Sequence, residues 1–236
     1  RDTDRSRGLG DVYKRQANGA TLNKDDKEKY RKLSMDLSML TLQFDQNALK
    51  DKNRFELLIT DENELSGLPE SARDAAAMLA KSKDKNGWLF NLSAPSYIPF
   101  MRYSDKRDLR EKMYREYMSV GNKGDEFDNK DIIKKIVNIR LEIAQLMGFK
   151  NYAEYALEHT MAKNSANVYK LLNQLLEAYK PIAINEYNAV EGFALGTEKE
   201  NITVMPWDWS YYSEKLRDIR FKVCLLYTSP SPRDRS

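Results

Sequence analysis

Apolar residues recur every three or four positions along most of the chain, which is the spacing of amphipathic α-helices. Leu33, Leu37, Leu40 and Phe44 follow this spacing and predict one long helix over about residues 23–51. Further stretches of the same kind predict helices at about residues 69–83, 106–119, 130–147, 151–161 and 165–194, and a last helix that opens at Pro206. The pattern therefore predicts a mainly α fold.

The helix expected over 165–194 is the longest of these. Its apolar stripe is expected to face inward and consists of Val168, Leu171, Leu172, Leu175 and Tyr179. Pro181 lies inside the same pattern and lacks an N–H group, so a kink is expected there.

Polar side chains at the expected helix starts are suited to capping free backbone N–H groups. The expected N-caps are Asp61, Asp105, Asn151, Ser165 and Asp208, with Asp128 or Asn129 before the helix over 130–147. Asp61 also has Glu64 three residues later, as in a capping box. Most acidic clusters of the chain are therefore interpreted as caps and not as catalytic pairs.

The short apolar run 88–92 is bounded by turn residues and is expected to be a strand, and the run 55–59 is expected to be a strand or an extended link. Residues 93–99 are expected to be extended, because Pro95 and Pro99 disfavour the α region for the residue before each of them. We expect two or three short strands at most. No Ser/Gly-rich linker interrupts residues 17–223, which indicates one continuous domain.

The two ends of the chain show no helical or strand periodicity. A DNA segment that encodes residues 224–234 also encodes residues 6–16 on its opposite strand, and it resembles a transposase-type sequencing adaptor. We therefore expect residues 1–16 and 224–236 to be non-native. Residues 17–223 would then be a native, internal fragment of a longer protein.

This division changes the charge of the chain. The 236 residues carry 39 basic and 36 acidic side chains, a net charge of +3. The two ends hold seven basic and four acidic residues, which leaves 32 of each in 17–223. Nucleic-acid binding then has no electrostatic support. The single Cys excludes a disulfide within the chain, and no apolar run reaches the ~20 residues of a membrane span.

Few residues have the types and spacing of a catalytic or metal site. His159 is the only histidine, whereas a helical zinc motif needs two on one face, so we interpret it as a surface or partly packed residue. No Gly-rich phosphate loop or nucleophile elbow is present. Basic and acidic residues alternate over 105–116, which is typical of a solvated helix face. Taken alone, these observations describe a helical domain without a complete active site.

Aromatic side chains cluster at the start of the last expected helix. Trp207, Tyr211 and Tyr212 could line a groove for a peptide, since Trp and Tyr combine an apolar ring with a hydrogen-bonding group. Such residues more often form a core seam with their hydroxyl groups at the surface. Both interpretations stay open at this point.

Several short runs together resemble the thimet oligopeptidase family of zinc metallopeptidases. In chain order they are LSGLP at 65–69, GW at 87–88, APSYIP at 94–99, RDLRE at 107–111, FDNKDII at 127–133, RLEIA at 140–144, GFKNYAEY at 148–155, MA at 161–162 and WDWSYYSEKL at 207–216. The resemblance covers essentially all of 17–223 and is nearest to the bacterial peptidyl-dipeptidase (dipeptidyl carboxypeptidase) branch.

The resemblance implies the helical, non-zinc part of a two-lobed, neurolysin-like peptidase domain. The intact protein would be a cytoplasmic monomer that uses zinc to hydrolyse short peptides and release C-terminal dipeptides. Its H-E-x-x-H motif would lie later in the sequence, so no catalytic or metal residue is assigned in this chain, and the fragment is expected to bind no zinc and be inactive. Trp207, Tyr211 and Tyr212 are the substrate-channel candidates. The alternative is a stand-alone helical interaction module without catalysis.

Overall fold

The computed structural model describes residues 22–198 and 202–221, which are mainly helical as the apolar spacing predicts. The residues divide into two compact units. Unit 1 contains 22–48 and 124–177, and unit 2 contains 49–123, 178–198 and 202–221. The expected non-native ends, 1–16 and 224–236, lie outside the described residues.

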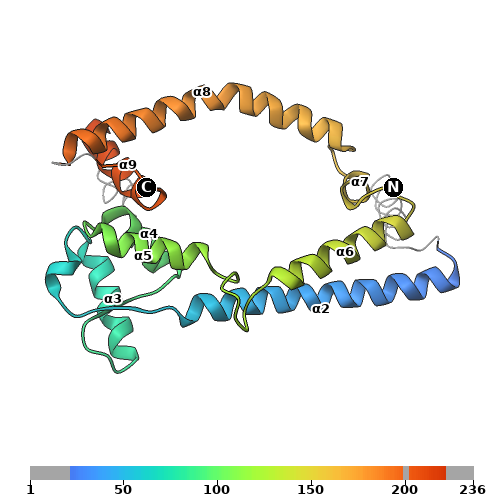
Figure 1. Cartoon of the computed structure of the whole chain (residues 1–236), viewed down its shortest axis with the longest axis horizontal. Coiled ribbons are helices and arrows are strands. Elements are labelled where there is room, and N and C mark those ends of the chain that lie inside the picture. Colours follow the sequence, from blue (N-terminus) through green and yellow to red (C-terminus); the bar gives the residue numbers. More distant parts are fainter. Residues whose placement is uncertain (1–21, 199–201, 222–236) are drawn as a thin grey trace, which may run out of the picture. The chain divides into compact units, whose positions relative to one another are not determined.

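Unit 1 is built from helices. Most of α2 (Lys24–Arg54) packs beside α6 (Lys130–Leu146), followed by α7 (Tyr152–Leu157) and the first part of α8 (Ser165–Thr197), as Figure 1 shows. Asn129 joins the first two, because its Nδ2 donates to the Phe44 carbonyl oxygen at 3.0 Å and its Oδ1 accepts from Asn47 Nδ2 at 3.1 Å. Asp128 Oδ1 accepts from the Lys130 N–H, so the expected start of this helix is confirmed.

Unit 2 has a small sheet among four helices. The sheet is β1 (Leu57–Ile59) paired antiparallel with β2 (Trp88–Phe90), in the register Leu57 opposite Phe90. Both expected strands are therefore confirmed. The turn η1 (Glu62–Leu65) follows β1, with Asp61 Oδ1 accepting from the Asn63 N–H as its cap. The helices are α3 (Glu70–Ser82), α4 (Ala94–Tyr103), α5 (Arg107–Met118) and α9 (Pro206–Phe221), with the end of α8 (Figure 1).

The core of unit 2 joins the sheet to these helices. Its buried members include Leu57, Ile59, Leu65, Phe90, Leu92, Phe100, Met101, Met113 and Trp207. A second buried cluster lies between α8 and α9 and contains Val190, Ala194, Val204, Tyr211 and Tyr212. Burial of this apolar surface is the main favourable contribution to the stability of the unit.

Residues 94–103 form the helix α4, so the expectation of an extended segment over 93–99 was wrong. Pro95 lies in the first turn, where no N–H partner is needed, and the helix therefore accepts it. Pro99 lies further in and removes one backbone hydrogen bond. Burial of Phe100 and Met101 in the core outweighs this loss, which is a tertiary effect that the proline positions do not reveal.

Three expected helix caps were also wrong. At α8 the cap is Asn164, whose Oδ1 accepts from the Asn167 N–H at 2.9 Å, and Ser165 is the first residue of the helix. Lys106, and not Asp105, precedes α5 at the cap position, and no side chain caps that helix end. Asp208 lies inside the first turn of α9, three positions after Met205. The Asp105 carboxylate is instead bonded to Tyr211 of α9. The Asp208 carboxylate bonds to α5 and also accepts from the Met205 N–H at the start of its own helix.

The apolar stripe of α8 is mostly exposed, contrary to the expectation that it faces inward. Four of its five residues, Leu171, Leu172, Leu175 and Tyr179, expose between 42% and 61% of their surface. Leu176 and Ile182 on the same helix are exposed as well. A helix with such a stripe is normally buried on that side, so α8 carries an unsatisfied apolar face within the described chain.

Gly67 is expected to tolerate no side chain. Its φ of +83° favours glycine, and a Cβ there would lie 2.1 Å from the Tyr103 carbonyl oxygen. Gly67→Ala should therefore lower the free energy of unfolding by about 2 kcal/mol or more, measured by urea denaturation. Gly148→Ala is the matched control, because its φ is +85° with nothing within 4 Å of the Cβ, and it should cost only about 1 kcal/mol. Equal effects of the two variants would contradict a steric role for Gly67.

Candidate functional site

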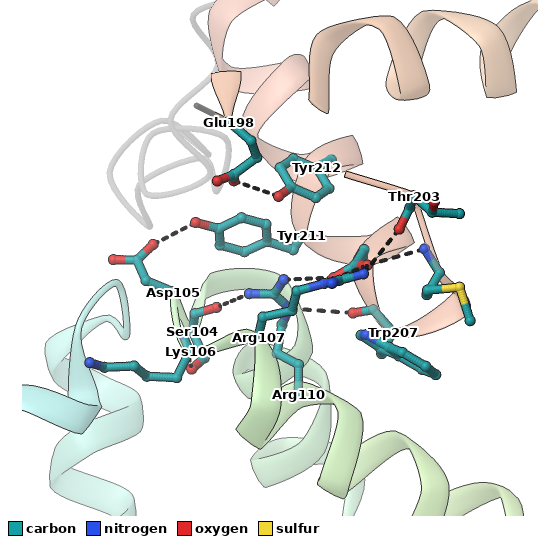
Figure 2. A network of polar contacts seen from close by, with 12 residues as sticks. Ser104, Asp105, Lys106, Arg107, Arg110, Glu198, Thr203, Trp207, Tyr211 and Tyr212 are labelled. Carbon is teal, nitrogen blue, oxygen red and sulfur yellow. Dashed lines mark hydrogen bonds and ion pairs between the residues drawn. The ribbon is translucent and has the colours of Figure 1, made fainter. Parts of the chain in front are cut away.

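A buried carboxylate, that of Asp208, lies at the centre of a polar cluster between α5 and α9 (Figure 2). Arg110 Nη2 donates to its Oδ1 at 2.9 Å. Arg107 donates to both oxygens, with Nε at 3.1 and 3.0 Å and Nη2 at 2.7 Å from Oδ2. The exposed fractions of the Asp208 and Arg110 residues are 0% and 1%. Two guanidinium groups thus satisfy one carboxylate in the interior of unit 2.

The cluster also fixes backbone positions at both helix starts. Asp208 Oδ2 accepts from the Met205 N–H at 3.1 Å, as the third residue of a helix does in a capping box. Arg110 Nη1 donates to the Ser104 carbonyl oxygen at 2.7 Å. The Arg107 Nη2 donates to the Thr203 carbonyl oxygen at 3.0 Å. These bonds hold the segment before α9 against α5 and so orient α9.

Opposing effects set the pKa of Asp208. Its burial alone would raise the pKa of the carboxyl group, since the charged form loses hydration. Hydrogen bonds from Arg107, Arg110 and the Met205 N–H outweigh this effect and hold the pKa below its ordinary value. The carboxylate is therefore charged at neutral pH and is unsuited to act as a general acid.

Tyr211 and Tyr212 extend the cluster along α9. The Tyr211 hydroxyl donates to Asp105 Oδ1 at 2.6 Å, and the Arg110 guanidinium lies 4.0 Å from the Tyr211 ring centroid. The Tyr212 hydroxyl donates to Glu198 Oε1 at 2.5 Å. Burial, reinforced by the neighbouring carboxylates, raises the pKa of both hydroxyl groups, so both are neutral at physiological pH.

The three substrate-channel candidates lie close together, but their side chains are buried. Trp207, Tyr211 and Tyr212 expose 6% or less of their surface and belong to the two cores of unit 2. This is the arrangement of the core seam that the sequence left open as the alternative to a groove. The exposed rings of this region are Trp209 on α9 and Tyr187 on α8, which stack with centroids 5.9 Å apart.

The cluster contains residues that the sequence did not single out. Residues 105–116 were interpreted as a solvated helix face, but Arg110 is buried and paired with Asp208, so that interpretation was wrong for this residue. Glu111 and Arg115, four residues apart, do form an ion pair on the exposed face of α5. Arg110 lies about one turn after the exposed Arg107 on α5. As one charged residue among several, it has no feature in the sequence that marks it as the buried one.

The described residues place no three His, Cys, Asp or Glu side chains where they could hold a metal ion. His159 is half exposed beside Glu158 at 3.5 Å. No catalytic step is therefore derived from these side chains. Within the described ranges, no helix has both the length and the apolar character of a membrane span.

The sequence of the chain is similar to a family of known proteins. The model of Peptidase family M3 matches residues 100–230, which include the end of α4, the whole of α5 and the polar cluster around Asp208. Oligopeptidase A of Haemophilus influenzae is 38% identical over 211 residues, covering 87% of this chain and 30% of that protein. The probable cytosolic oligopeptidase A of Arabidopsis thaliana is 36% identical over 215 residues, with the same coverage of both chains.

The similarity to a dipeptidyl carboxypeptidase is lower. The enzyme of that name from Escherichia coli is 29% identical over 206 residues, again covering 87% of this chain and 30% of that protein. The expected nearness to the peptidyl-dipeptidase branch is therefore not confirmed. The chain spans less than a third of the length of these relatives.

Proposed function

The chain belongs to peptidase family M3, and from this we propose that it is part of a zinc metallopeptidase that hydrolyses short oligopeptides. The observation that carries the proposal is the similarity to proteins named oligopeptidase A, which extends over 87% of the chain at 36–38% identity. The family resemblance implies the zinc, which would be held by residues beyond this chain. The name of the cytosolic relative supports a cytoplasmic location, although another Arabidopsis relative is named organellar.

We propose that residues 17–223 contribute scaffold and one wall of a peptide channel. The apolar face of α8 supports this role, because Leu171, Leu175 and Tyr179 need a covering partner that the described residues do not supply. In a protein of the relatives' length, the remaining part of the polypeptide is available to cover it. In this proposal the intact protein is a monomer whose partners are short peptides. It binds neither nucleic acid nor a membrane.

Within that wall we propose an indirect role for the three aromatic candidates. Trp207, Tyr211 and Tyr212 are buried, so they would hold α9 in place and would not touch the peptide. The stacked rings of Trp209 and Tyr187 are exposed and are one aromatic surface of α8 and α9 that a peptide could reach.

Two activity types remain to be separated in the intact protein. The similarity to proteins named oligopeptidase A supports hydrolysis of oligopeptides, while a peptidyl-dipeptidase would release C-terminal dipeptides. Mass spectrometry of the products of a longer peptide separates the two, because a peptidyl-dipeptidase would release only dipeptides from the C-terminus and cleavage elsewhere would give longer C-terminal products.

The proposal is tested by the complete gene that encodes this chain. Sequencing that gene in its source should reveal H-E-x-x-H on a predicted helix within a few hundred codons after codon 223. A stop codon before any such motif would instead favour the stand-alone helical interaction module.

The purified 236-residue chain is expected to show no zinc-dependent peptidase activity, because no described group of side chains can hold the metal. The measurement is cleavage of a short fluorogenic peptide with and without added Zn²⁺. Full-length oligopeptidase A of Escherichia coli is the positive control, since it is 36% identical over 212 residues. If the chain cleaved the peptide and a chelator abolished that cleavage, the assignment of the zinc ligands to another part of the protein would be overturned.

A further inference from the structure

A polar pocket of about 740 Å³ lies in unit 2, next to the loop between η1 and α3. Its lining residues are Glu62, Asn63, Leu65, Ser66, Gly67, Leu68, Arg73 and Lys106. They come from η1 with the loop that follows it, from α3 and from the residue before α5, so three segments converge on one space. The pocket does not include the buried carboxylate of Asp208 or its two arginine partners.

Two cations of this pocket have no anionic partner within the described chain. Arg73 Nε is buried and has no hydrogen-bond partner, which is costly for an N–H group unless a ligand or water accepts from it. Lys106 forms no ion pair with any described carboxylate. Figure 2 shows its side chain pointing away from the hydrogen bond between Asp105 and Tyr211.

The acids near the pocket do not neutralise both cations. Asp61 accepts from the N–H and Nδ2 of Asn63, and Asp105 accepts from Ser66, Tyr211 and Lys215. Glu62 is the single acid among the lining residues, so the lining carries a net positive charge. An anion would therefore gain from the local field.

The loop that forms one side of the pocket is held at two points. Ser66 Oγ donates to Asp105 Oδ2 at 2.7 Å, and the Asp105 N–H donates to the Ser66 carbonyl oxygen at 2.9 Å. Gly67, with a φ of +83°, allows the loop to approach Tyr103 closely. Arg73 and Lys106 are thus presented by a loop and two helices whose positions are set before any ligand binds, which lowers the entropy cost of binding.

We propose that this pocket binds an oxyanion, either a carboxylate or a phosphate, through Arg73 and Lys106. Arginine offers a planar set of N–H donors that matches two oxygens of such a group, and lysine adds a point charge. The unpartnered Nε of Arg73 is the donor that the ligand would satisfy. This inference does not depend on the peptidase proposal, since it concerns only residues of this chain.

The test is a titration of the ¹⁵N-labelled 236-residue chain followed by NMR. Inorganic phosphate and N-acetylglycine, a carboxylate, are added in separate experiments, and the Nε–Hε resonance of Arg73 is followed. At least one anion should shift this resonance to saturation. Lys106→Gln should weaken binding about tenfold, because it removes one charge-assisted hydrogen bond. Lys112→Gln removes the same charge from an exposed position on α5 and should change the affinity less than about twofold.

The two anions distinguish the source of the oxyanion. Saturation by phosphate alone identifies a phosphate site, and saturation by N-acetylglycine identifies a carboxylate site. Absence of saturation with both anions would overturn the proposal, as would equal weakening by Lys106→Gln and Lys112→Gln. Arg73→Gln, with its helix content checked by circular dichroism, provides a second variant that should abolish binding.

Discussion

Replacing Asp208 by alanine is expected to lower the free energy of unfolding by about 3–5 kcal/mol, which is the cost of breaking a buried ion pair from one side. The substitution leaves the buried guanidinium of Arg110 without its carboxylate and removes the acceptor of the Met205 N–H. The measurement is urea denaturation of the whole chain, followed by circular dichroism. Asp218→Ala is the matched control on the same helix, because Asp218 is exposed, and it should change stability by less than about 0.5 kcal/mol.

The same carboxylate predicts a pH dependence. Its pKa is lowered in the folded chain, so its contribution to stability is complete above the unfolded pKa of about 4 and is lost as pH falls through the folded value. Stability measured between pH 7 and pH 2 should therefore fall less steeply for Asp208→Asn than for the parent chain below about pH 4. Parallel profiles would show that Asp208 is not held ionised by Arg107 and Arg110.

Replacing Phe100 alone by alanine is also expected to lower the free energy of unfolding by about 3–5 kcal/mol. Phe100 is fully buried, and its ring meets that of Phe90 edge to face with centroids 4.8 Å apart. Removing it opens a cavity between α4 and the sheet. The loss should also reduce the helix content of α4, since Pro99 weakens that helix and packing supports it.

Ile98→Ala is the control for this prediction. Ile98 lies on the same helix but is 46% exposed, so truncation should cost less than about 1 kcal/mol. A similar loss in both variants would mean that the intrinsic stability of α4, and not the burial of Phe100, decides whether the segment is helical.

Local signals predicted the helices and strands well. The spacing of Leu33, Leu37 and Leu40 identified α2, and Gly148 marked the end of α6, because both patterns depend on residues close in sequence. The short apolar runs identified β1 and β2 for the same reason. Capping was predicted correctly at Asp61 and Asn151, whose side chains accept from N–H groups two and three residues later. At α8 the cap was predicted one residue too late, at Ser165 in place of Asn164.

The predictions failed where partners are distant in sequence. Asp105 and Asp208 are of a residue type that often caps helices. Asp105 bonds instead to Tyr211, and Asp208 bonds to Arg107 and Arg110, in each case across about a hundred positions. Arg110 has the sequence context of a solvated residue, yet it is buried, because its pairing with Asp208 depends on how α5 and α9 pack. The exposure of the α8 stripe is likewise a property of the assembled chain, since periodicity shows that a face is apolar and does not show what covers it.

By itself the sequence determined a mainly α chain with two short strands and a resemblance to one peptidase family, because these depend on local periodicity and on ordered motifs. Only the tertiary structure decided that Arg107, Arg110 and Asp208 form a buried cluster, that Trp207, Tyr211 and Tyr212 are packed inside, and that Arg73 and Lys106 share a pocket. The physical reason is that a buried charge is stable only beside partners that satisfy it, and the fold brings those partners together from distant positions.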